Sequence, residues 1–246
     1  MRIKTGSDPA GVFILGMHRS GTSCLTGMLG QYGLFLGNVR TSGRFNPKGN
    51  QEIPEVNRIN NQLLAGSKGA WHRPAVVTRG HPHLKTRIGR MRNTLEKSNT
   101  LWGIKDPRLL YCLPLWKKPG DCIIATFRHP SAVTASLASR NRSLPEERQL
   151  NTNWQELWYK YNCRLIHLYE TRPFPLINFD WPPEKYCRAV RQAACNLGLQ
   201  GEHRDFFSPL LRHHPLPEDP EIPNPALREL YHKLLALSEA GKKGGI

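Results

Sequence analysis

The 246-residue sequence contains no long hydrophobic run. Its apolar runs are short and its mean hydropathy is −0.52, so no segment predicts a transmembrane helix. The first residues, MRIKTGSDPAG, contain no apolar core, and we therefore expect no secretory signal. Together these two absences predict a cytoplasmic protein.

Cysteine pairs and metal-ligand spacings are also missing. No CxxC pair is formed by the six cysteines, which are Cys24, Cys112, Cys122, Cys163, Cys187 and Cys195. His81 and His83 are two residues apart, but no acidic or cysteine ligand stands near them. We therefore expect reduced cysteines that fill space in the core, and no metal site.

Acidic residues are few. The chain has 19 Asp and Glu against 35 Lys and Arg, which gives a formal net charge of +16. This excess predicts anionic partners, and nucleic acids, acidic glycans and membrane surfaces all satisfy it. The most basic part is 66–100, where eight Lys and Arg face one acid, Glu96. This part is either an electrostatic funnel for an anionic substrate or a solvated helix face.

One stretch near the start predicts an anion site. Val12–Leu15 is a short apolar run bounded by glycines, which is typical of a buried strand. Apolar residues over 24–29 are spaced as one face of a helix. Between them, residues 16–23 read GMHRSGTS. Glycines let successive N–H groups converge, and a helix N-terminus adds its positive dipole end and unpaired donors.

This loop matches the nucleotide P-loop pattern GxxxxGK[ST] only in part. Its two glycines have the right spacing, but Thr22 stands where the lysine belongs and the positive charge lies inside the loop, as Arg19. A kinase also needs an acidic magnesium partner, and the apolar run Cys122–Phe127 leads into Arg128 instead. An ordinary Gly-rich turn is the simpler alternative, but the strand, the glycine spacing, the cation and the hydroxyls all favour phosphate.

Three stretches resemble the sulfotransferases that use PAPS (3′-phosphoadenosine 5′-phosphosulfate). The residues HRSGTS, at 18–23, look like the family's 5′-phosphosulfate loop. Arg128 after a strand, with Ser136 eight residues on in the next helix, resembles its 3′-phosphate motif. Gly103–Arg108, GIKDPR, is similar to a KDPR-like segment of bacterial and tyrosylprotein enzymes. The motifs stand in family order within 12–137, and the likeness thins farther on.

Four apolar runs, each followed by a helical pattern, predict an α/β fold with a mostly parallel central sheet flanked by helices. The resemblance implies that this is the P-loop NTPase-like sulfotransferase fold. We expect a single domain over 1–246, with flexible tails at about 1–10 and 240–246. The expected strands are Val12–Leu15, Leu101–Lys105, Cys122–Phe127 and Pro175–Phe179. The expected helices include Gln51–Ala65, Ser131–Arg140, a helix to Tyr169 opened by the capping box Thr152–Gln155, Tyr186–Leu199 and Leu227–Ser238.

The resemblance also implies the co-substrate site. Loop N–H groups and hydroxyls would hold the phosphosulfate, while a guanidinium and a hydroxyl would recognise the 3′-phosphate that distinguishes PAPS from ATP. His18 more simply positions the loop, although it is an outside candidate for a base. PAPS would be the donor and 3′-phosphoadenosine 5′-phosphate (PAP) the product. The implied binding residues are His18, Arg19, Ser20, Gly21, Thr22, Ser23, Arg128 and Ser136.

The implied reaction moves a sulfuryl group in line onto a hydroxyl or amine. Arg19 and Lys105 would neutralise charge on the bridging oxygen, and we expect no metal requirement because the sulfuryl group carries less charge than a phosphoryl group. Glu52, which follows an NPKG turn, is the first candidate for the base and Asp106 the second. Alternatively, Glu52 caps its helix and Asp106 pairs with Arg108.

The acceptor is left open between a glycan, a lipid-linked sugar and a small metabolite. Lysine is common in the family at the place of Arg19, and the animal cytosolic branch carries a histidine base on the strand that here ends in Lys105. The chain therefore looks nearer to the bacterial and carbohydrate-type branches. Three other functions remain: a P-loop kinase, a polyanion or nucleic-acid binder, and a family member that binds PAPS without turnover. Nucleic-acid binding leaves the ordered phosphate motifs unexplained.

Overall fold

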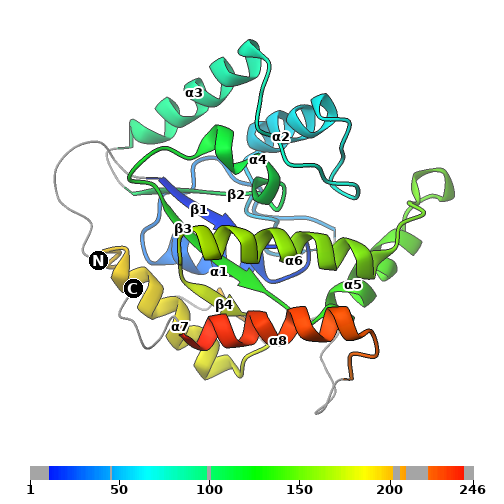
Figure 1. Cartoon of the computed structure of the whole chain (residues 1–246). Helices are drawn as coiled ribbons and strands as arrows, with labels where there is room; N and C mark the ends of the chain where they lie inside the picture. The colour runs from blue at the N-terminus through cyan, green and yellow to red at the C-terminus, as the bar shows by residue number, and fades with distance from the viewer. Residues whose placement is uncertain (1–10, 45, 99–100, 202–205, 209–220, 241–246) are drawn as a thin grey trace.

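The computed structural model describes residues 11–44, 46–98, 101–201, 206–208 and 221–240 (Figure 1). In these residues a four-stranded parallel sheet has the order β2-β1-β3-β4. Its strands are β1 (Gly11–Leu15), β2 (Trp102–Lys105), β3 (Cys122–Phe127) and β4 (Leu176–Asn178). The predicted tails were 1–10 and 240–246; Ala240 is the last residue of α8 (Pro225–Ala240), and the rest of both tails lies outside the described residues. The predicted α/β class with a parallel sheet is confirmed.

The helices surround this sheet on both faces, as predicted. Figure 1 shows α6 and α8 on the viewer's side of the sheet and α1 behind it. Their bounds are α1 Thr22–Gln31, α2 Pro54–Gly66, α3 Pro82–Glu96, α4 Leu109–Trp116, α5 Pro130–Arg142, α6 Trp154–Thr171, α7 Pro183–Asn196 and α8 Pro225–Ala240, with a short 3₁₀ turn at Glu146–Arg148.

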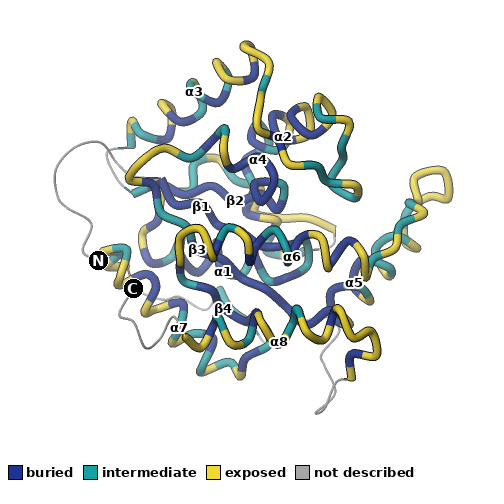
Figure 2. Tube along the Cα trace, viewed as in Figure 1, coloured by how far each residue is buried: buried dark blue, intermediate teal, exposed yellow. Residues whose placement is uncertain are grey.

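Strand β1 is buried along its whole length, which explains its continuous apolar run. Val12 and Ile14 pack against α1 and α7, while Phe13 and Leu15 face the core formed with α2, α4, α6 and α8. Figure 2 shows the strands buried at the centre and the outer faces of the helices exposed. In register, Ile14 pairs with Lys105, so β1 and β2 end at one edge of the sheet.

Several local features differ from the sequence-based predictions, and one is α7, which spans Pro183–Asn196 where Tyr186–Leu199 was predicted. Helix α2 begins at Pro54, three residues later than predicted, because proline favours the first helical turn. Asn153, and not Thr152, caps α6, and its Oδ1 accepts hydrogen bonds from two N–H groups. Helix α4 was not predicted, since its residues LLYCLPLW are apolar on nearly all sides and show no helical period. All six cysteines are free thiols, but only Cys112 is fully buried.

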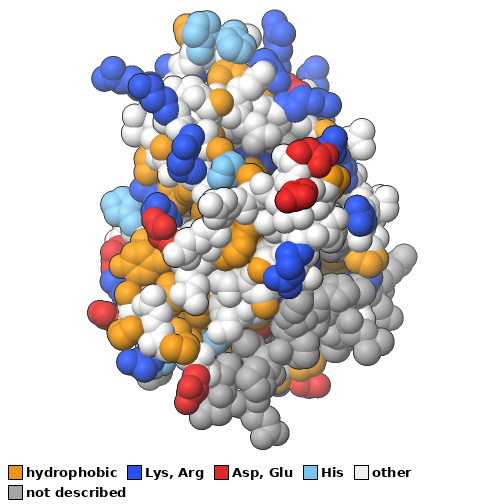
Figure 3. Space-filling model, turned by 90° about the vertical axis from the view of Figure 1, so that its right-hand side faces the viewer, with side chains coloured by type: hydrophobic (Ala, Val, Ile, Leu, Met, Phe, Trp, Pro, Cys, Tyr) orange, Lys and Arg blue, Asp and Glu red, His pale blue; other side chains and the backbone are white. Residues whose placement is uncertain are grey.

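Part of the basic segment 66–100 is structural. Arg92 on α3 is 3 % exposed, and its Nη1 lies 2.8 Å from Oδ2 of Asp121, just before β3. Arg87 on the same helix lies 2.6 Å from Glu55 of α2. These pairs join α3 to the rest of the fold. The other six cations of the segment are exposed. Figure 3 shows Lys and Arg side chains over the upper part of the molecule, at the height of α2 and α3.

Candidate active site

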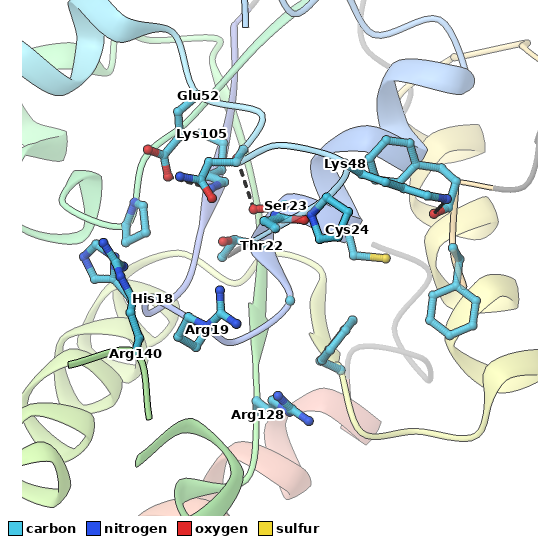
Figure 4. A pocket seen from close by; sticks show the side chains of 18 of the residues that line it. His18, Arg19, Thr22, Ser23, Cys24, Lys48, Glu52, Lys105, Arg128 and Arg140 are labelled. Carbon is cyan, nitrogen blue, oxygen red and sulfur yellow. Dashed lines mark hydrogen bonds and ion pairs between the residues drawn. The ribbon is translucent and has the colours of Figure 1, made fainter. Parts of the chain in front are cut away.

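A cavity of about 190 Å³ opens at the carboxyl edge of the sheet (Figure 4). Its walls come from the loop after β1, the start of α1, the segment before α2, the ends of β2 and β3, and α5. Six cations and one carboxylate are among the described residues that line it: Arg19, Lys48, Lys105, Arg108, Arg128, Arg140 and Glu52. This excess of positive charge suits a ligand with several negative charges.

The loop after β1 needs glycine at two positions. Gly16 has φ +145°, and a Cβ there would lie 2.4 Å from the carbonyl oxygen of Thr126. Gly21 has φ +82°, and a Cβ there would lie 2.2 Å from the ring of Phe179. The loop therefore sits tightly against the end of β3, and α1 begins at Thr22 with no side-chain cap in the described structure. The first turn of α1 thus lines the cavity, and the N-terminus of a helix favours an anion.

Arg19 joins the first predicted motif to the second. It has a left-handed backbone, with φ 66°, and its Nε donates a 2.8 Å hydrogen bond to Oγ of Ser136 on α5. Burial, together with the charges of Arg140 and Arg128, lowers the pKa of Arg19 to about 10. The guanidinium is still protonated near neutral pH. Ser136 itself is buried and holds Arg19, and the structure does not place it among the lining residues.

The three predicted hydroxyls have different surroundings. Thr22 and Ser23 line the cavity, whereas Ser20 is buried and does not. The Ser23 hydroxyl donates to the carbonyl oxygen of Asn50 at 3.0 Å, which ties α1 to the segment before α2 (Figure 4). The Oγ of Ser20 has no hydrogen-bond partner among the described residues.

Glu52 and Lys105 form a close ion pair on the cavity wall. The Lys105 Nζ lies 2.6 Å from the Glu52 Oε1, and their side chains are 2 % and 12 % exposed. Lys105 is the last residue of β2, and Glu52 precedes Ile53, the N-cap of α2. No side chain caps that helix in the described structure, so the capping interpretation of Glu52 is wrong. Its carboxylate instead meets a cation beside the phosphate loop.

Asp106 has a different environment, although it directly follows Lys105. It is fully buried and lies outside the set of residues that line the cavity. Its Oδ2 accepts hydrogen bonds from the side-chain amides of Asn57, at 2.8 Å, and Asn60, at 3.1 Å. Its Oδ1 lies 2.8 Å from Nη1 of Arg108. Burial alone would lower the pKa of Arg108, but attraction to Asp106 and Glu52 raises it.

Arg128 reaches the cavity from the end of β3. Its Nε donates to Oδ1 of Asp180 at 3.0 Å, and Oδ2 of the same carboxylate accepts from the backbone N–H of His129 at 2.8 Å. The guanidinium carbon lies 5.4 Å from the centre of the Phe179 ring. Asp180 therefore orients Arg128, and no sequence motif indicated it.

Sequence reasoning also missed several residues of the wall, including Arg140, Trp71 and Phe179. Arg140 lines the cavity from α5. It lies four residues after Ser136, hence on the same helix face, and that spacing was a signal. Trp71 lines the cavity too, and its ring lies 4.9 Å from that of His18. Nothing in the sequence around Trp71 indicated this role. None of the eight cations in 66–100 lines the cavity.

His18 is held as a neutral imidazole. Burial lowers its pKa well below the ordinary value, and Arg108, Arg140 and Lys105 lower it further. Its Nε2 has no hydrogen-bond partner among the described residues. The histidine thus occupies a crowded cationic wall without adding charge to it.

The comparisons with known proteins give one similarity. No protein-family model matches the chain, and no curated protein is similar to it in sequence. Among solved structures, it is similar to the "Sulfotransferase Domain from the Curacin Biosynthetic Pathway", with a TM-score of 0.55 and 16 % identity. The match covers 94 % of this chain and 99 % of that one. It shows the fold, so the predicted sulfotransferase fold is confirmed.

A membrane-spanning helix and a metal-binding cluster are both absent from the described residues. No helix in that part of the chain is long and apolar enough to cross a membrane. No group of three or more His, Cys, Asp or Glu that could hold a metal ion occurs there either.

Proposed function

We propose that this protein is a sulfotransferase that moves the sulfuryl group of PAPS to a hydroxyl or amine of an acceptor. One observation carries the proposal. A single cavity brings together the phosphate loop, the Glu52–Lys105 pair and Arg128, although they follow three different strands. Ligands of open α/β sheets sit at this carboxyl edge. The similarity in fold to a sulfotransferase domain supports the same reaction class.

The donor would lie along the loop and the start of α1. The N–H groups there, with the hydroxyls of Thr22 and Ser23, would hold the 5′-phosphosulfate. Arg128, oriented by Asp180, would bind the 3′-phosphate through charge-assisted hydrogen bonds. Ser136 would act indirectly, by holding Arg19 in place. The rings of Phe179, Phe206 and Phe207 also line the cavity and offer apolar faces to a purine.

The transfer step would use the ion pair beside the loop. The acceptor oxygen attacks sulfur, the bond from sulfur to the 5′-phosphate oxygen breaks, and PAP leaves with both electrons of that bond. Glu52 takes the acceptor proton, and its partner Lys105 holds the carboxylate in place on the cavity wall. Lys105 and Arg19 stabilise the charge that grows on the bridging oxygen. Asp106, surrounded by its own donors, serves to hold Arg108.

A labelled-donor assay tests this function. The protein is incubated either with ³⁵S-labelled PAPS or with γ-³²P-labelled ATP and magnesium, over one panel of phenols, sugars, amines and glycans. We expect label to move from PAPS and not from ATP. Transfer of the ATP label, with none from PAPS, would overturn the proposal in favour of a kinase.

A further inference from the structure

The cavity has a second end, away from Arg128. The charges of Arg108, Arg140, Lys105 and Arg19 act on His18. The charge of Glu52 acts on both Arg108 and Arg140. In Figure 4, His18 and Arg140 lie together on one side of Arg19, and Arg128 lies on another. This end, which we call the acceptor end, therefore adjoins the Glu52–Lys105 pair.

Trp71 forms a fixed wall of the acceptor end. Its ring stacks on Trp154 with centroids 6.2 Å apart and an interplanar angle of 18°, and it also packs on His18. The Tyr161 hydroxyl donates a 2.8 Å hydrogen bond to the Trp71 carbonyl. Because rings and backbone both hold it, Trp71 presents a preformed flat surface. Such a surface favours the apolar face of a sugar or an aromatic ring.

Two guanidinium groups share this end of the cavity. Arg108 pairs with buried Asp106 through Nη1, while its buried Nε has no hydrogen-bond partner among the described residues. Arg140 comes from α5, and burial lowers its pKa; Glu52 raises that pKa and Arg108 lowers it. Two cations that repel each other favour an anion between them, since it would relieve their repulsion and meet two planar sets of donors.

We propose that the acceptor is a ring compound that carries its own anionic group, such as a carboxylate or a sulfate. The ring would lie against Trp71, the anionic group would meet Arg108 and Arg140, and the reacting hydroxyl would face Glu52. This inference rests on the proposed function, because it assigns the acceptor of the same reaction. It goes further by excluding neutral acceptors as the preferred substrates.

Matched probes that differ at one group, which is anionic in one member and neutral in the other, test the inference. With PAP at saturation, calorimetry measures the affinity for 4-nitrophenyl β-glucuronide against the β-glucoside, and for 4-hydroxybenzoate against 4-hydroxybenzamide. We expect the anionic member to bind about tenfold more tightly in at least one pair, as charge-assisted hydrogen bonds predict.

Three variants locate the effect. In Arg140→Gln the preference for charge should fall to about twofold or less. The control Arg142→Gln removes the same charge from an exposed position on the same helix and should keep the preference. In Trp71→Ala both members of a pair should bind more weakly, with the preference unchanged.

The possible failures are distinguishable. If PAP does not bind the wild-type protein, the proposed function itself fails. If PAP binds but neither pair shows a charge preference, or no probe binds at all, the proposed function stands and this inference is overturned. A preference that survives in Arg140→Gln would also overturn the assignment.

Discussion

Glu52 and Asp106 are both carboxylates beside Lys105, but their environments predict opposite mutant phenotypes. Glu52 lines the cavity and pairs with Lys105, so Glu52→Gln should lower the transfer rate by about 10²- to 10⁴-fold while PAP affinity stays close to wild type. The labelled-donor assay and calorimetry measure both. Full activity of Glu52→Gln would contradict its assignment as the base.

Asp106→Asn is the matched comparison. It removes the charge that faces Arg108 at a fully buried site, and breaking a buried pair costs about 3 kcal/mol or more. Urea unfolding should therefore show a large loss of stability. Loss of transfer at unchanged stability would instead make Asp106 a participant in the reaction.

Arg128 should give the protein a higher affinity for nucleotides with a 3′-phosphate than for those without one. Arg128→Ala should weaken PAP by about 10- to 100-fold, because it removes charge-assisted hydrogen bonds, and should weaken adenosine 5′-phosphate far less. Titration calorimetry measures both ligands, with Arg142→Ala as an exposed control. Equal losses for the two ligands would refute the 3′-phosphate role.

His18 should make stability depend on pH. Its pKa is lowered in the folded protein, so below about pH 6.5 the unfolded chain takes up a proton that the folded protein does not. The free energy of unfolding must then decrease as the pH decreases, by at most about 1.4 kcal/mol per pH unit. Urea unfolding between about pH 7 and about pH 5.5 should show a smaller loss in His18→Gln than in wild type. Identical pH dependence in both would contradict a neutral His18.

At the scale of single residues, the sequence indicated which motifs meet, but not which of their side chains reach the cavity. The phosphate loop, Lys105 and Arg128 could be placed, because each follows a recognisable strand. Ser136 and Asp106 belong to the same motifs, yet the fold turns them toward Arg19 and Arg108. Helix rotation and local hydrogen bonding decide that outcome, and neither can be read from motif spacing.

At the scale of elements, the strands were the most predictable part. Their short apolar runs have to be buried on both faces of a parallel sheet, so few other secondary structures are compatible with them. Amphipathic α6 was predictable for a similar reason, because one face is apolar. Helix α4 was not, since six of its eight residues are buried and its interior holds Pro114. Tertiary packing, and not an amphipathic pattern, fixes that helix.

The phosphate loop gives an element-scale prediction that contrasts two glycines. Gly21→Ala should cost about 1–3 kcal/mol of stability and weaken PAP, because φ is +82° and the new Cβ would meet the Phe179 ring. Gly89→Ala, inside α3 with open space around it, should instead stabilise the protein by about 0.5–1 kcal/mol. Chemical denaturation measures both. A Gly21→Ala protein with wild-type stability and PAP affinity would contradict the tight loop described here.

At the scale of the whole molecule, composition indicated an anionic ligand but not its place. The net charge of +16 is a property of the whole chain. In the most basic segment, 66–100, Arg87 and Arg92 form ion pairs with neighbouring elements, and none of its cations reaches the cavity. The cations that do line it come from separate parts of the chain, and only the assembled fold brings them together.

The central claim is that this cavity holds PAPS, and titration calorimetry tests it most directly. PAP is titrated into the protein in the presence of a chelator, and ATP with magnesium is titrated in parallel. We predict tight metal-free binding of PAP and weak binding of ATP, because the role that we propose for Arg128 is to bind the 3′-phosphate, which ATP lacks. Tight binding of ATP with magnesium, and none of PAP, would contradict the account.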